Sequence, residues 1–148
     1  DGIDAAVLYP TLGMFYGAIT DPDFAAAVCR AYYLWIADFC NTHPGRLIGM
    51  AMLPMQSVER SVEELTYARN TLGLCGGFLR PNPYNKRLLS DPVYDLVWAT
   101  AQDLDMPIAF HEAAGGLHLL GADRVSGFGA RHIAAHTLEM QLASLSVI

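Results

Sequence analysis

The sequence predicts an α/β fold in which short buried strands alternate with helices along a parallel sheet. The first observation is a set of four apolar runs at residues 3–9, 46–54, 74–79 and 106–111. Short apolar runs bounded by turn signals are typical of strands that are buried on both faces. The second observation is that the segments between these runs show the apolar spacing of helices. Such alternation indicates parallel strands joined by right-handed crossovers.

The first strand, residues 3–9, ends at Pro10, and a loop with two glycines is predicted over residues 11–20. This loop contains Met14 and Phe15. Apolar side chains on a loop that follows a strand either line a pocket or fold back onto the core. The sequence leaves both interpretations open.

The first helix is predicted over residues 22–41. Asp21 can cap it, Pro22 suits the first helical position, and Asp23 favours the positive end of the helix dipole. The turn at residues 43–45 ends it. The side chains with the spacing of a buried stripe are Ala25, Val28, Cys29, Tyr32, Trp35, Ile36 and Phe39.

The second strand, residues 46–54, contains Gly49, which indicates the close approach of another backbone. A helix over residues 57–72 follows, and Gly73 is its predicted C-terminal cap. The predicted inner face of this helix consists of Val58, Val62, Leu65 and Ala68.

The third helix is predicted over residues 92–104, after the start signal at residues 90–92, with Val93, Leu96, Val97 and Ala101 facing inward. A glycine-containing loop is expected over residues 115–129 and a last helix over residues 131–147. The apolar positions of that last helix are Ile133, Leu138, Met140, Leu142 and Leu145.

Two architectures fit this order of elements. One is a small doubly wound sheet, and the other is part of a (β/α)8 barrel. A full barrel needs roughly 250 residues, whereas this chain has 148. It would therefore form about half of a barrel.

Composition excludes several classes of protein. The net charge is −6 and there is no basic run, so nucleic acid is not an expected partner. No apolar stretch has membrane-spanning length, and no signal peptide is visible. The chain begins with Asp1, which fits a processed chain or a piece of a longer one. Apolar residues make up 53% of the chain. At this fraction, part of the apolar surface could be covered by a partner or by a missing segment.

The three cysteines, Cys29, Cys40 and Cys75, are an odd number without CxxC spacing. A disulfide framework or a thiolate zinc site is therefore not expected. We interpret them as small buried hydrophobic residues in a reducing compartment, which predicts a cytoplasmic protein.

Polar side chains gather where the predicted strands end. Tyr9 ends the first strand, Arg80 and Asn82 follow the third, and His111 ends the fourth. Because the carboxyl ends of parallel strands meet at one rim, and helix N-termini point there, this rim is the predicted site. The sequence has no GxGxxG, Walker, GxSxG or HExxH motif, which argues against nucleotide binding, serine hydrolysis and metalloproteolysis.

His111 is the first candidate for chemistry, either as a metal ligand or as a hydrogen-bonded structural residue. A metal site needs three or four ligands. Glu112 would point to the opposite face of the strand, while His118, His132 and His136 are further candidates.

Arg80 is held extended by the proline that follows it. Its guanidinium can clamp a carboxylate with two hydrogen bonds, or can form a salt bridge with a neighbouring loop. Tyr9, Phe15, Arg80 and Asn82 are the predicted substrate-binding residues. No catalytic residue is assigned.

Several segments together resemble the amidohydrolase-related family of metal-dependent hydrolases and decarboxylases, the group that includes aminocarboxymuconate-semialdehyde decarboxylase. The segments are DAAVLYP, HPGRLIGMAMLP, EELTYARNTLGLCGGFLRPNP and LSDPVYDLVWATAQDLDMPIAFHE. The resemblance extends over nearly the whole chain. It implies a distorted (β/α)8 barrel with one divalent metal at the C-terminal rim, usually zinc, with manganese as an alternative.

The resemblance also implies that only one family ligand is present, His111 at barrel strand five. The HxH pair of strand one, the Asp of strand eight and the catalytic His have no counterpart here, so residues 1–148 would be a single partial domain with strands two to five. Alone it should be inactive, and its open sheet edges favour pairing, including a homo-oligomer.

The expected function is that of a metal-dependent hydrolase that activates a metal-bound water for a small-molecule substrate. Non-oxidative decarboxylation by the same family is the alternative. A non-catalytic α/β domain that binds a ligand at the same rim is the competing hypothesis.

Overall fold

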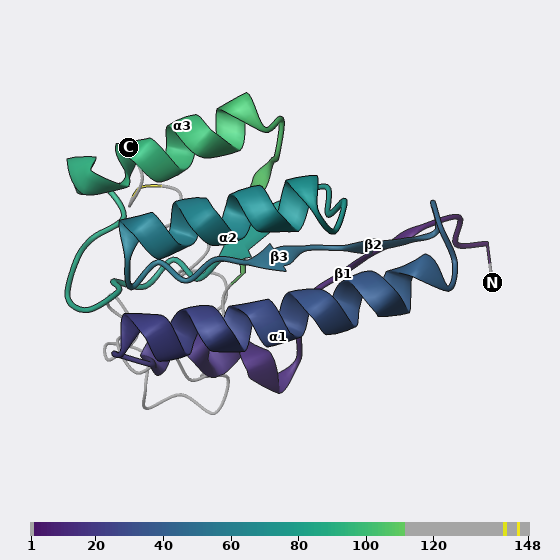
Figure 1. The fold of residues 1–148 in the computed structure, drawn as a ribbon, viewed down its shortest axis with the longest axis horizontal. Coiled ribbons are helices and arrows are strands. Elements are labelled where there is room, and N and C mark those ends of the chain that lie inside the picture. Colours follow the sequence, from purple (N-terminus) through teal and green to yellow (C-terminus); the bar gives the residue numbers. More distant parts are fainter. Residues whose placement is uncertain (1, 112–140, 142–144, 146–148) are drawn as a thin grey trace.

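The computed structural model describes residues 2–111 together with residues 141 and 145 (Figure 1). Helices and strands alternate along the chain as predicted. In order, the elements are β1 (Ala6–Leu8), η1 (Leu12–Ala18), α1 (Pro22–Asn41), β2 (Leu47–Gly49), β3 (Ala51–Met52), α2 (Val58–Asn70), β4 (Gly77–Leu79), η2 (Pro92–Tyr94), α3 (Asp95–Asp103) and β5 (Ile108–Phe110).

All strand pairs among the described residues are parallel: β1 with β2, β3 with β4, and β4 with β5. β2 and β3 are the two halves of the second predicted strand, which is interrupted at Met50. The Met50 amide donates to the Leu8 carbonyl at 3.2 Å, and the Ala51 amide donates to the Gly76 carbonyl at 2.8 Å. This segment therefore joins β1 on one side to β4 on the other.

The strand order in space follows the order along the chain. A doubly wound sheet reverses its order at a switch point, whereas a (β/α)8 barrel does not. The sequential order of the described strands therefore favours part of a barrel over a doubly wound sheet.

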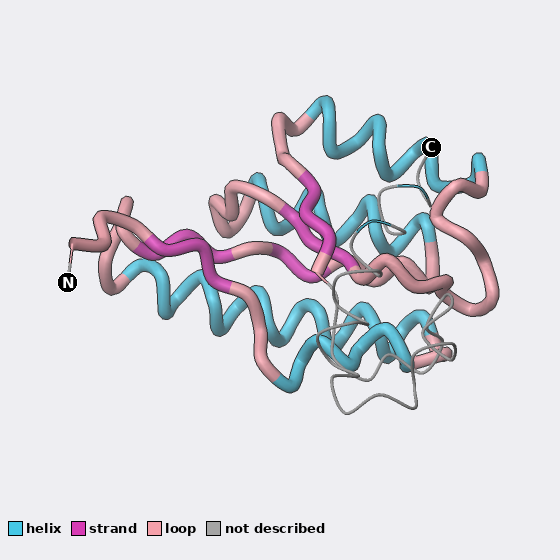
Figure 2. The backbone as a smooth tube through the Cα atoms, turned by 180° about the vertical axis from the view of Figure 1, so that it is seen from behind, coloured by secondary structure: helices cyan, strands magenta, loops and turns pink. Residues whose placement is uncertain are grey.

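The helices α1, α2 and α3 lie side by side on one face of the strands, and the view from behind shows the strands in front of them (Figures 1 and 2). The core lies between these two layers and includes Tyr33, Ile36, Leu53, Leu65 and Phe78. This arrangement is the outer helical layer and inner strand layer of a barrel wall.

α1 has the predicted bounds, and the Phe24 amide donates to the Asp21 carboxylate at 2.8 Å as a capping bond. The predicted stripe is only partly correct. Trp35 is 57% exposed and Phe39 is 44% exposed. The buried face instead runs through Cys29, Tyr33, Ile36 and Cys40. The helix has two neighbouring apolar stripes, and the stripe predicted from the sequence combined residues of both.

Other expectations need correction. The predicted loop at residues 11–20 contains the seven-residue 3₁₀ helix η1. Val93 and Leu96 are exposed rather than inward-facing. Val93 lies in the 3₁₀ turn η2, which does not have the period of an α-helix, and Leu96 lies beside the buried positions Val97 and Ala101 of α3. Cys75 is an exposed free thiol, whereas Cys29 and Cys40 are buried as expected.

Both ends of α2 follow the sequence signals. Ser57 caps α2, and Gly73 adopts φ +69° at its C-terminal end. The expected loop at 115–129 lies outside the described residues. So does the expected last helix, apart from residues 141 and 145, which are helical. None of the helices in the described part of the chain is long and apolar enough to cross a membrane.

Gly49 lies under α1, and the close approach there involves side chains rather than a backbone. A Cβ atom at this position would lie 2.8 Å from Ile36 Cγ1 and 3.3 Å from Cys40 Sγ. We expect Gly49→Ala to lower the free energy of unfolding by about 1–3 kcal/mol, because a packed core resists added volume. Urea denaturation measures this.

The matched test of that cause is a double-mutant cycle with Ile36→Ala. If the clash with Ile36 is responsible, Gly49→Ala costs clearly less in the Ile36→Ala background. Strictly additive losses would contradict the packing explanation.

Candidate functional site

The ends of the parallel strands bring together the polar residues that the sequence placed there. Tyr9 follows β1, Arg80 follows β4 and His111 follows β5. The His111 amide donates to the Leu79 carbonyl at 2.9 Å, which extends the β4–β5 ladder by one residue. The predicted rim is therefore formed.

His111 is half-buried between aromatic rings. Its ring centroid lies 5.1 Å from that of Tyr9 and 6.3 Å from that of Phe78, both edge-to-face. Tyr9 also packs edge-to-face on Phe78 at 5.4 Å. Two of the predicted site residues, Tyr9 and His111, are thus in contact, and the aromatic contacts fix the place of the imidazole.

One imidazole fits a divalent metal as one ligand but does not hold it alone, since catalytic zinc sites in proteins use three protein ligands. Among residues 2–111, 141 and 145, no group of three or more His, Cys, Asp or Glu side chains is placed to bind a metal. The further candidates Glu112, His118, His132 and His136 lie outside the described residues. The described part of the chain therefore offers one candidate ligand, His111.

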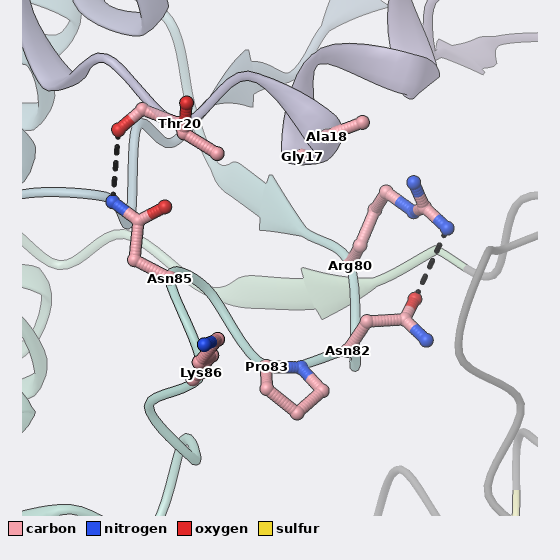
Figure 3. A pocket seen from close by; sticks show the side chains of 8 residues that line it. All are labelled: Gly17, Ala18, Thr20, Arg80, Asn82, Pro83, Asn85 and Lys86. Atoms are coloured by element: carbon pink, nitrogen blue, oxygen red, sulfur yellow. Dashed lines mark hydrogen bonds between the residues drawn. The ribbon is translucent and has the colours of Figure 1, made fainter.

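A pocket of about 650 Å³ opens beside this rim (Figure 3). Its walls are the end of η1 and the segment that follows β4. The described residues that line it are Gly17, Ala18, Thr20, Arg80, Asn82, Pro83, Asn85 and Lys86.

Of the predicted substrate-binding residues, Arg80 and Asn82 line this pocket, whereas Tyr9 and Phe15 are not among its described lining residues. Phe15 lies on η1 and is 48% exposed. The sequence did not single out Asn85 and Lys86. The signal for them was a polar dipeptide between a proline-rich turn and the next element.

Arg80 is only 5% exposed. Its backbone amide donates to the Tyr84 hydroxyl at 2.9 Å, and its Nη2 donates to Asn82 Oδ1 at 3.1 Å. Its Nε is buried without a hydrogen-bond partner. A Cβ atom at Gly17 would lie 3.3 Å from Arg80 Cδ, so the glycine makes room for this side chain. The salt bridge to a loop that the sequence allowed for Arg80 is not among the ion pairs of the described residues.

Two buried tyrosines support the wall behind Arg80. The Tyr16 and Tyr84 hydroxyls lie 3.1 Å apart and are hydrogen-bonded. Burial raises the pKa of both phenols above the usual value. The Tyr84 hydroxyl therefore holds the backbone amide of Arg80, and the Tyr16 hydroxyl holds the Tyr84 hydroxyl.

This burial predicts a loss of stability in alkaline solution. Because the folded-state pKa of Tyr16 and Tyr84 lies above the unfolded value of about 10, the contribution is fully present below pH 10. It falls as the pH rises beyond 10, since the unfolded chain releases protons that the folded chain keeps. Urea unfolding at pH 8 and pH 11 measures the decrease, and Tyr16→Phe should make it smaller. An equal decrease in the variant would contradict the assignment.

The family model described as Amidohydrolase matches residues 4–144. The chain belongs to this amidohydrolase family.

Two curated relatives of this amidohydrolase-family chain are decarboxylases. One is the 2-amino-3-carboxymuconate-6-semialdehyde decarboxylase of Dictyostelium discoideum, 28% identical over 148 residues, which are 100% of this chain and 40% of that protein. The other is the gamma-resorcylate decarboxylase of Polaromonas sp. strain JS666, 30% identical over 99 residues, which are 64% of this chain and 30% of that protein. The chain thus spans less than half the length of these relatives.

Solved structures agree on the fold. The dihydroxybenzoic acid decarboxylase from Polaromonas sp. JS666, crystallised with manganese and the inhibitor 2-nitroresorcinol, superposes with a TM-score of 0.81 at 25% identity. The match covers 99% of this chain and 45% of that one. The 2,6-dihydroxybenzoate decarboxylase from Rhizobium matches with a TM-score of 0.79 at 23% identity, over 99% and 46% of the two chains. The fold is therefore a partial (β/α)8 barrel.

Proposed function

We propose that the whole protein is a metal-dependent, non-oxidative decarboxylase of a small carboxylic acid. The observation that supports this most is the match of 99% of the chain to a decarboxylase crystallised with manganese and an inhibitor. The sequence alone favoured hydrolysis, with decarboxylation as the alternative. The named relatives favour the alternative, because both curated ones are decarboxylases.

In this proposal residues 1–148 form one partial domain with barrel strands two to five, and His111 is one ligand of a divalent metal. A bound divalent metal would act as a Lewis acid that polarises the substrate. Manganese is the metal named with three of the similar structures, and zinc stays an expectation of the sequence. Homo-oligomerisation and a cytoplasmic location also stay predictions.

The described residues would bind and shield the substrate. Arg80 and Asn82 offer hydrogen-bond donors at the pocket wall, and Tyr9 holds the His111 ring edge-to-face. Phe15, exposed on η1, is a candidate apolar contact. In decarboxylation the bond to the carboxylate carbon breaks, carbon dioxide leaves, and a proton takes its place. Burial next to aromatic rings protects such a site from water.

The test measures whether the substrate loses a carbon atom as carbon dioxide. Full-length protein loaded with manganese is incubated with a panel of hydroxybenzoic acids and with matched amides and lactones. We expect carbon dioxide to be released in equal amount to the acid consumed, measured by mass spectrometry of the gas and chromatography of the product. A product that keeps every carbon and gains water would identify a hydrolase instead.

The same samples separate an enzyme from a non-catalytic binding domain. An enzyme of this kind should contain about one equivalent of divalent metal per chain, measured by plasma mass spectrometry. A full-length protein without metal and without turnover would support the binding domain.

A further inference from the structure

The pocket beside the rim has an unusual balance of charge for this protein. Two of its described lining residues, Arg80 and Lys86, are cationic, and none is Asp or Glu. The chain as a whole has a net charge of −6. A concave site with cations alone attracts anions and raises their local concentration.

Arg80 has the environment of a residue that can bind an anion. It is 95% buried, yet none of the four ion pairs formed by the described residues includes it. Buried charges are normally paired, because removal from water is costly. Its Nη2 is oriented by Asn82, as Figure 3 shows, and its Nε has no hydrogen-bond partner.

Lys86 lines the same pocket from a turn further along the segment that follows β4, and its backbone there is strained. Asn85 and Lys86 both have positive φ, 49° and 69°. Two hydrogen bonds between Tyr84 and Arg87, at 3.0 and 2.9 Å, close this two-residue turn. Glycine is the residue that suits its second position. Backbone strain of this kind persists mostly where a side chain has a function.

The turn is also tied to the other wall of the pocket. Asn85 Nδ2 donates to the Thr20 carbonyl at 3.0 Å, which links the turn to the segment that follows η1 (Figure 3). Lys86 is therefore placed by a fixed turn even though its side chain is exposed.

We propose that Arg80 and Lys86 form an anion subsite that selects substrates with a second carboxylate besides the one that reacts. This inference rests on the proposed decarboxylase function. His111 packs against Tyr9 and Phe78 and is not a described lining residue of the pocket. In this proposal the second carboxylate binds in the pocket at Arg80 and Lys86, and the reacting carboxylate lies on the side of His111.

The size and the surface of the pocket suit a small organic acid. Its volume of about 650 Å³ lies within the range of ligand sites, roughly 300–1,000 Å³. Gly17, Ala18 and Pro83 provide apolar wall, and the planar guanidinium of Arg80 suits a carboxylate. The substrate class is thus a dicarboxylic acid with a small ring or chain.

The test compares two ligands that differ in one charge. Benzene-1,3-dicarboxylate and 3-carbamoylbenzoate have the same shape, but the second has a neutral amide in place of one carboxylate. Calorimetric titration of the full-length protein should show the dicarboxylate binding about tenfold more tightly, as expected for charge-assisted hydrogen bonds. Equal affinities would overturn the proposal.

Three variants assign that preference to residues. Arg80→Gln should reduce it to less than about threefold, because the fork and the charge are lost. Lys86→Gly should also weaken it, while the urea midpoint stays the same or rises, since glycine relieves the strained turn. Arg87→Gln is the control, because Arg87 is exposed, pairs with Asp91 at 3.6 Å and is not a described lining residue.

A tenfold preference that survives in Arg80→Gln and in Lys86→Gly overturns the subsite, and so does an equal loss in Arg87→Gln. Should Arg80→Gln fail to fold, Lys86→Gly gives the answer alone. Inorganic phosphate that binds as tightly as the dicarboxylate would overturn the carboxylate assignment in favour of a phosphate site.

Failure of the subsite and failure of the proposed function are separable. Carbon dioxide release from monocarboxylic and dicarboxylic acids with equal efficiency would reject the subsite and keep the decarboxylase. A charge preference that depends on Arg80, without turnover of any acid, would keep the subsite and reject the decarboxylase.

Discussion

Replacement of His111 by alanine in the full-length protein is expected to remove both bound metal and activity. Loss of an outer partner of a metal ligand already costs about 10–100-fold in affinity or activity, so loss of the ligand itself should cost at least about a hundredfold. The metal content should fall from about one equivalent to a small fraction. Plasma mass spectrometry and carbon dioxide release measure the two effects on the same sample.

His43→Ala is the matched control for this experiment. His43 is exposed and lies just before β2, at the amino end of the strands and away from the rim. It should keep full metal content and activity. If His111→Ala kept its metal with native circular dichroism, His111 would be a structural histidine held by Tyr9 and Phe78, and the metal proposal would lose its one described ligand.

The position of His111 at the rim could be predicted from sequence because its signal is local. An apolar run that ends in a polar residue marks the carboxyl end of a buried strand, and parallel strands bring such ends to one rim. Arg80 and Asn82, which the same logic selected, line the pocket, and their role in binding stays a prediction. This logic needed only the order of the elements, which the structure confirms from β1 to β5.

The other lining residues of the pocket could not be predicted, because they depend on features that sequence patterns do not encode. Lys86 lines it through a turn in which a lysine adopts a positive φ, and turn rules would expect glycine there. Tyr9 and Phe15 follow the same strand, yet Tyr9 packs on His111 while Phe15 is exposed on η1. The direction of side chains in a 3₁₀ segment was not predictable once that segment was interpreted as a loop.

The prediction of which face of α1 is buried was partly wrong, also for a physical reason. Its two apolar stripes differ by one residue in phase, so periodicity alone could not tell which of them contacts the strands. What fixes the orientation is a set of contacts distant in sequence. The Tyr33 hydroxyl donates to the Met52 carbonyl, and Arg30 is paired with Glu64 across 34 residues. Such pairs are visible only once the chain has folded.

The Arg30–Glu64 pair leads to the second large expected effect, on stability. Arg30 Nε and Nη2 donate to the two oxygens of Glu64, each at 2.8 Å, and the guanidinium lies 3.5 Å above the Tyr67 ring centroid. Glu64 is only 5% exposed. Arg30→Met should lower the free energy of unfolding by about 3–5 kcal/mol, because it leaves a buried carboxylate without a partner. Urea denaturation at pH 7 measures this loss.

The cause of that loss can be isolated with two further variants. Arg60→Met breaks the ion pairs with Asp23 and Glu63, whose side chains are 75% and 57% exposed, so it should lower stability far less than Arg30→Met does. Adding Glu64→Leu to Arg30→Met removes the unpaired charge, so much of the lost stability should return, since apolar replacement of a whole buried pair is often neutral. A double variant as unstable as Arg30→Met would mean that the methylene packing of Arg30 on Tyr67, rather than the charge of Glu64, holds α1 against α2.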